Sequence, residues 1–157
     1  MRINRLLQLV LILFTLQVSA DVSAEQLTSY AFVNEDGTLR IKRKTIHLHG
    51  IYIPNTDKNC RTSQRSLFCG SRAALALEFK IKGFVRCDIT GENSDGSLTG
   101  LCRVNYSAFE EGDDLSAYLL ERGWAVALPD APFEYQALEK IARSRGLGVW
   151  GFAFGSP

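Results

Sequence analysis

Residues 38–55 read TLRIKRKTIHLHGIYIPN, and this stretch decides the predicted fold. Thr38–Ile41 and Thr45–Ile51 are rich in residues that favour β-strands. Before them lie the turn signal Asn34-Glu35-Asp36-Gly37 and another short apolar run, Thr28–Val33. Together these segments predict a three-stranded meander.

A helix and a strand pair are predicted after the polar, irregular stretch over 54–70, which we expect to form a long loop. Ser71 is the expected cap of the helix and Gly83 its end, because apolar residues recur at helical spacing between them. Strands are then expected over 84–89 and 98–106, joined by a flexible polar linker.

Two further helices complete the pattern. Asp113 or Asp114 is the expected cap of a helix over 115–122, and a last helix is expected from about Pro132 to Arg145. This order of elements predicts an α+β fold in which five strands form an OB-type β-barrel with three helices. Such barrels bind oligonucleotides or oligosaccharides on one face, and the fold alone does not decide which.

The N-terminus has the features of a secretory signal peptide. Two arginines precede an apolar run over 6–18, and small residues allow cleavage after Ala20 or Ala24. We therefore expect removal of residues 1–24, leaving 25–157 as one exported domain, periplasmic or secreted, without a transmembrane span. An uncleaved N-terminal anchor is the alternative.

Cys60, Cys69, Cys87 and Cys102 are the four cysteines of the chain. In an exported protein they are expected to form disulfides, for which three pairings exist. If the two strands that carry Cys87 and Cys102 are antiparallel neighbours, the pairs Cys60–Cys69 and Cys87–Cys102 are favoured. A zinc site is the rival interpretation, but the spacing contains no C-x-x-C pair. None of the four has the features of a nucleophile.

Charge is unevenly distributed along the chain. Eleven basic residues and two acids lie between Arg40 and Arg86, whereas eleven acids and two basic residues lie between Asp88 and Glu139. A basic block of this kind fits an anionic partner, although blocks in sequence need not form separate faces. An ordinary solvated surface is the alternative.

His47 and His49 are the only histidines, two positions apart. On one strand their rings would share a face and could approach a metal ion or a phosphate. Only Glu35 or Asp36 in the preceding turn could add a carboxylate, and metal sites usually need three or four ligands. We therefore expect no metal, no cofactor and no catalytic residue here.

Six short motifs occur along the chain. They are Thr38-Leu39-Arg40-Ile41, Leu48-x-Gly50-Ile51-x-x-Pro54, Cys69-Gly70, Asp114-Leu115, Glu121-Arg122-Gly123-Trp124-Ala125 and Ala142-Arg143-x-x-x-Gly146-Leu147-Gly148-Val149-Trp150. In order and spacing they resemble the staphylococcal nuclease-like (thermonuclease) family over about residues 28–151. The cysteine positions and the C-terminus resemble an exported bacterial branch that includes proteins named for succinoglycan biosynthesis.

The resemblance implies a chemistry whose groups this chain largely lacks. Active members hydrolyse DNA and RNA with Ca²⁺, which carboxylates hold, while a Glu handles the attacking water and two arginines neutralise the phosphate. The motifs place Gly37 at a metal Asp, with Glu35 or Asp36 nearby, and they place His47 at the first Arg, Tyr52 at another metal Asp, Asn55 at the catalytic Glu and Thr99 at the second Arg.

These replacements predict a nuclease-like protein without catalysis. Asn55 cannot accept a proton as a carboxylate does, and Thr99 carries no charge. We expect a binding or accessory module, whose partner is an anionic polymer (nucleic acid or polysaccharide) or an envelope protein. A role in exopolysaccharide production or the envelope is implied only by the resemblance. The alternative is a metal-dependent nuclease that uses Asp36, Glu35, His47 and Arg40 or Arg43.

Overall fold

The computed structural model describes residues 25–54, 61–62, 65–66 and 69–151. Its helices are α2 (Cys69–Lys80), α3 (Leu115–Glu121) and α4 (Phe133–Ser144), followed by the short 3₁₀ helix η1 (Gly148–Trp150). The strands are β1 (Gln26–Tyr30), β2 (Phe32–Val33), β3 (Leu39–Ile41), β4 (Lys44–Leu48), β5 (Ile51–Tyr52), β6 (Arg61–Thr62), β7 (Arg65–Ser66), β8 (Phe84–Glu92), β9 (Leu98–Val104), β10 (Asp113–Asp114) and β11 (Val126–Ala127). The predicted signal peptide, Asn55 and Cys60 lie outside the described residues.

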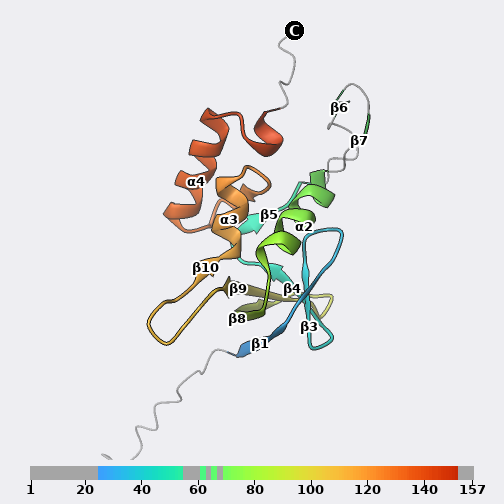
Figure 1. Cartoon of the computed structure of the whole chain (residues 1–157), viewed down its shortest axis with the longest axis vertical. Coiled ribbons are helices and arrows are strands. Elements are labelled where there is room, and N and C mark those ends of the chain that lie inside the picture. The colour runs from blue at the N-terminus through green and yellow to red at the C-terminus, as the bar shows by residue number, and fades with distance from the viewer. Residues whose placement is uncertain (1–24, 55–60, 63–64, 67–68, 152–157) are drawn as a thin grey trace, which may run out of the picture.

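The fold is α+β, with a strongly curled, half-barrel sheet and three helices gathered at one end of it (Figure 1). The sheet runs β1-β8-β9-β4-β3-β2, with β10 added to β9. Neighbours are antiparallel except β4 and β9, which run parallel with His47 opposite Thr99. The two ends of this path, β1 and β2, are separated in the chain by Ala31 alone.

Two of the predicted strands are each divided. The run Thr28–Val33 was expected as one strand of a meander, but its first part pairs with β8 and its second with β3, because the sheet curls between them. The run Thr45–Ile51 is also divided, since Gly50 has a φ of 70° and ends β4, after which β5 pairs with β11. Gly50 is closely covered by Tyr135, so a Cβ there would crowd that ring and would also be strained by the positive φ.

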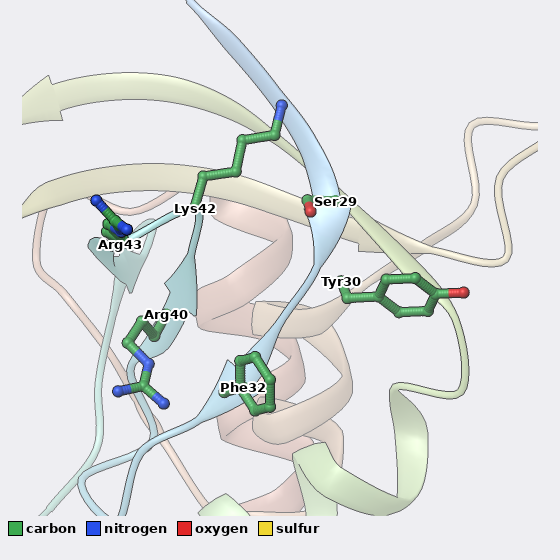
Figure 2. Close-up of a pocket in the computed structure, with 6 residues that line it drawn as sticks. All are labelled: Ser29, Tyr30, Phe32, Arg40, Lys42 and Arg43. Atoms are coloured by element: carbon green, nitrogen blue, oxygen red, sulfur yellow. The ribbon is translucent and has the colours of Figure 1, made fainter.

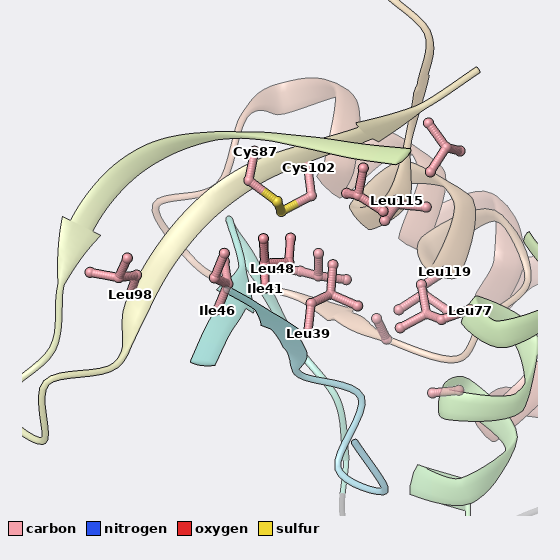
Figure 3. Packing of buried hydrophobic residues seen from close by; sticks show 14 of the residues in the cluster. Leu39, Ile41, Ile46, Leu48, Leu77, Cys87, Leu98, Cys102, Leu115 and Leu119 are labelled. Atoms are coloured by element: carbon pink, nitrogen blue, oxygen red, sulfur yellow. A yellow bond between two sulfur atoms is a disulfide. The ribbon is translucent and has the colours of Figure 1, made fainter. Parts of the chain in front are cut away.

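A buried hydrophobic cluster fills the concave side of the sheet, under the helices (Figure 3). Along β9 every second residue is buried, which is the period of a strand with one face in the core. Cys87 and Cys102 are paired across β8 and β9, with Cα atoms 4.0 Å apart, and form a disulfide within this cluster. This predicted pair is confirmed, while the pair Cys60–Cys69 lies outside the described residues.

The helix boundaries follow the predicted signals in part. Asp114 caps α3 as predicted, because its Oδ1 accepts the backbone N–H groups of Ser116 at 2.7 Å and Ala117 at 3.3 Å. The predicted cap Ser71 is wrong, since α2 begins at Cys69 and therefore includes Ser71. The predicted end at Gly83 is also wrong, because α2 ends at Lys80.

The flexible linker predicted between the last two long strands is absent from the described structure. β8 continues to Glu92, and a tight turn over 93–97 leads directly into β9. Among the described residues, no helix combines the length and apolar character needed to cross a bilayer. The disulfide between Cys87 and Cys102 is consistent with an oxidising compartment.

Candidate functional site

Two hollows adjoin the exposed side chain of His47, and together they are lined by three other positions singled out above, Gly37, Tyr52 and Thr99, while Asn55 lies outside the described residues. A hollow of about 260 Å³ is bounded by Asp36, Thr38, His47 and Tyr52, among others. A second hollow, of about 370 Å³, shares His47 and is also lined by Thr99 and the 93–97 turn. We call these two adjoining hollows the His47 site.

Two turns with the same sequence pattern, Asn-x-Asp-Gly-Ser/Thr, border the His47 site at 34–38 and 93–97. In the first, Asp36 Oδ1 accepts the backbone N–H of Thr38 at 2.9 Å and its hydroxyl at 2.7 Å. In the second, Asp95 Oδ1 accepts the same two groups of Ser97 at 2.9 Å and 2.6 Å. The repeat of the pattern is the signal that would have predicted a turn where we expected a linker.

Negative charge is therefore built into both edges of the His47 site. The hydroxyl and then the backbone N–H of Ser97 hold the pKa of Asp95 below its ordinary value, with a smaller contribution from the charge of His47. Asp95 is thus ionised at neutral pH. No lysine or arginine of the described residues lines either hollow. A bound phosphodiester would meet carboxylates here without the cations that neutralise it in phosphoryl chemistry.

Acid is expected to weaken the 93–97 turn. Because the pKa of Asp95 is below its ordinary 3.8 in the folded chain, the contribution of Asp95 to stability is complete above about pH 4. That contribution is lost as the pH falls through the lower, folded pKa. Urea unfolding at several pH values should show the stability gap between the native chain and Asp95→Asn shrinking below pH 4. A gap that stays constant below pH 4 would contradict this. Asp130→Asn, which removes an exposed carboxylate outside the turn, is the control and should show no such pH-dependent gap.

His49 does not join His47 in either hollow. It lies just beyond the end of β4, and its Nδ1 is 3.1 Å from the hydroxyl of Thr90. Within the described part of the chain, no three His, Cys, Asp or Glu side chains are grouped so that they could hold a metal ion.

A separate hollow of about 480 Å³ is lined by cationic and aromatic residues, of which Tyr30 points its ring away from the cations and packs it on Phe84 (Figure 2). We call it the basic–aromatic surface, and it is lined by Ser29, Tyr30, Phe32, Arg40, Lys42 and Arg43. Figure 2 shows Arg40 beside Phe32, and the Arg40 guanidinium carbon is 5.3 Å from that ring's centroid. Tyr30 and Phe32 are 63% and 64% exposed, so both rings offer apolar area to solvent.

The cations of the basic–aromatic surface are available to a ligand. Arg40, Lys42 and Arg43 make no ion pair with any other described residue, whereas the neighbouring Lys44 lies 2.7 Å from Glu25. Lys42 and Arg43 occupy the two-residue turn between β3 and β4 with φ of 47° and 70°. Such a turn favours Asn-Gly, so two bulky basic residues are held there against local preference.

The basic residues of this surface were recognised in the sequence as part of a charge block, but the rings from β1 and β2 were missed. The Lys42-Arg43 pair between two predicted strands was the sequence signal that could have indicated a binding surface here. No protein-family model matches the chain, and no curated protein is similar to it at a significant level.

Proposed function

We propose that this chain is an exported binding module with a nuclease-like, OB-type fold that does not hydrolyse phosphodiesters. The observation that carries the proposal is the separation of cations from the His47 site. Arg40, Lys42 and Arg43 line the basic–aromatic surface instead. The His47 site thus lacks the cations that phosphodiester hydrolysis needs, while the basic–aromatic surface has cations that can bind anions.

The strand pairing supports an OB-type arrangement. β1 and β2 act as one bent strand that pairs with β8 through its first part and with β3 through its second. A helix, α2, lies between the first three strands of the predicted barrel and the last two. The parallel pairing of β4 with β9 brings Thr99 opposite His47, which is where the resemblance requires two phosphate-binding positions to meet.

The chemistry of the His47 site argues against hydrolysis. In the nuclease family that the chain resembles, the positions of His47 and Thr99 are arginines, and the position of Tyr52 is a metal-binding aspartate. A lost electrostatic group of this kind costs on the order of a hundredfold in rate. The alternative nuclease would need Arg40 or Arg43 at the phosphate, but both lie at the other surface, with Arg40 stacked on Phe32.

The basic–aromatic surface favours a linear anionic polymer. Its ammonium and guanidinium groups are donors that match phosphate or carboxylate oxygens. Its exposed rings can stack on bases or on the apolar faces of sugars. Nucleic acid and acidic polysaccharide both satisfy this description. A role in exopolysaccharide or envelope processes, as the resemblance implies, would bring the protein into contact with acidic polysaccharide.

We expect the mature protein to bind such polymers without cutting them. Single-stranded DNA and RNA would be incubated with it in Ca²⁺, in other divalent ions and in chelator, and the products run on a gel. Metal-dependent cleavage that His47→Ala and Asp36→Ala abolish would overturn the proposal.

Binding would be measured by fluorescence anisotropy with labelled oligo-dT and with oligogalacturonate. Affinity should fall steeply with salt, and Arg40→Glu should weaken it. Lys140→Glu, at an exposed position of α4, makes the same charge change away from the basic–aromatic surface and is the matched control. If neither polymer binds, or if the two variants behave alike, the basic–aromatic surface is not the binding surface. The polymer that binds more tightly at equal salt identifies the ligand class.

A further inference from the structure

We propose that the hollow between His47 and the 93–97 turn binds a sugar ring, as part of a neutral, hydroxyl-rich saccharide. This inference goes beyond the proposed function, because it concerns another surface and an uncharged ligand. It begins from the kinds of side chain that line the hollow of about 370 Å³.

Hydrogen-bonding groups of both kinds line this hollow. They comprise the imidazole of His47, the amide of Asn93, the hydroxyls of Ser94 and Thr99, and the carboxylate of Asp95. Leu128, which is 38% exposed, adds apolar surface. Each hydroxyl of a sugar both donates and accepts, and the ring has apolar C–H faces, so a sugar matches this mixture.

Hydrogen bonds within the 93–97 turn hold the side chains of Asn93 and Asp95 in place before any ligand arrives. Asn93 Nδ2 donates to the Ser97 hydroxyl at 3.0 Å, and the backbone N–H of Gly96 donates to the carbonyl of Asn93 at 3.0 Å. Within the described residues, the amide oxygen of Asn93, Oδ2 of Asp95 and the ring nitrogens of His47 have no hydrogen-bond partner. Because Asn93 and Asp95 are already held, a ligand that binds them causes a smaller loss of conformational entropy.

Other ligand classes fit this hollow less well. Asp95 borders it and no described lysine or arginine does, so a phosphate or carboxylate would be repelled. A metal ion would need a group of ligating side chains that the described residues do not form. An uncharged ligand with many hydroxyls satisfies the open donors and acceptors without either difficulty.

The adjoining hollow offers room for a second sugar residue. It shares His47, Leu48 and Ile51 with the first and is also lined by Tyr52. Tyr52 is 55% exposed, so its ring presents a flat apolar face on which a sugar can lie. The His47 site therefore has the form of a short groove for an oligosaccharide.

The experiment is an NMR titration of ¹⁵N-labelled protein with maltotetraose, cellotetraose and a galactan tetrasaccharide. We expect one of these sugars to cause saturable shifts in the amides of His47, Tyr52 and residues 94–99, and not in those of Phe32 or Arg43. Glycerol at the same hydroxyl concentration is the control for a general solvent effect. Shifts that match those of glycerol, or no shifts with any tetrasaccharide, would overturn the proposal.

Two variants test the location. Asp95→Asn should weaken binding about tenfold, which is the effect of losing one charge-assisted hydrogen bond. Glu134→Gln removes one carboxylate charge from an exposed position of α4 that lines neither hollow, and it should change affinity much less. Ser94→Glu should abolish binding while preserving the turn, because Glu35 occupies the equivalent position of the other turn. Binding unaffected by Asp95→Asn and Ser94→Glu would place the sugar elsewhere.

The outcome is independent of the cleavage and polymer-binding assays. A protein that binds oligo-dT but no tetrasaccharide keeps the proposed function and loses this inference. Metal-dependent cleavage of DNA would instead remove the proposed function whatever the sugar titration shows.

Discussion

Replacement of both Cys87 and Cys102 by alanine is expected to lower the free energy of unfolding by about 3 kcal/mol. The disulfide joins residues 15 apart in the chain and restricts the unfolded ensemble accordingly. Both cysteines are fully buried in the hydrophobic cluster that also holds Leu48 and Leu115 (Figure 3), so their loss also removes packed atoms. Urea unfolding at neutral pH measures the change.

The other predicted pair provides the control for this experiment. In a Cys60→Ala/Cys69→Ala variant, any effect of a reducing agent reports on Cys87 and Cys102 alone. That variant should lose about 3 kcal/mol on reduction. The prediction fails if the free energy of unfolding falls by less than about 1 kcal/mol both in the Cys87→Ala/Cys102→Ala variant and on reduction of the Cys60→Ala/Cys69→Ala variant. The sheet would then hold β8 and β9 together without the disulfide.

Lys42→Asn/Arg43→Gly is expected to stabilise the protein while weakening its binding to oligo-dT. Asn-Gly adopts positive φ at both turn positions with little strain, so the free energy of unfolding should rise by about 1 to 2 kcal/mol. Loss of two phosphate contacts should weaken binding about 25-fold at roughly 0.1 M salt, since each contributes a slope of about 0.7. Anisotropy titrations and urea unfolding measure the two effects.

Opposite signs of the two effects distinguish a binding role from a merely structural one. If Lys42 and Arg43 served only the hairpin, the variant would be more stable and would bind unchanged, and the assignment of the basic–aromatic surface would fail. Lys44→Ala is the matched control, because Lys44 is paired with Glu25 and does not line the surface. It removes one charge from the same hairpin and should weaken binding much less than the double variant.

Local signals predicted those elements whose boundaries depend on neighbouring residues. The cap at Asp114 and the helix between Pro132 and Arg145 follow from short-range hydrogen bonding and helical spacing, and both are confirmed. Elements that depend on distant partners were predicted less well. The first strand is divided because its two parts meet β8 and β3, which no local pattern reports.

The candidate sites show the same division. The sequence by itself determined the residue types: two histidines two positions apart, an excess of cations before Arg86, and two Asn-x-Asp-Gly segments. Only the tertiary structure decided where they meet, since parallel pairing of β4 with β9 sets His47 beside Thr99. The curl of the sheet brings Phe32 against Arg40. Side chains far apart in sequence share a surface only after strand register and sheet curvature are set.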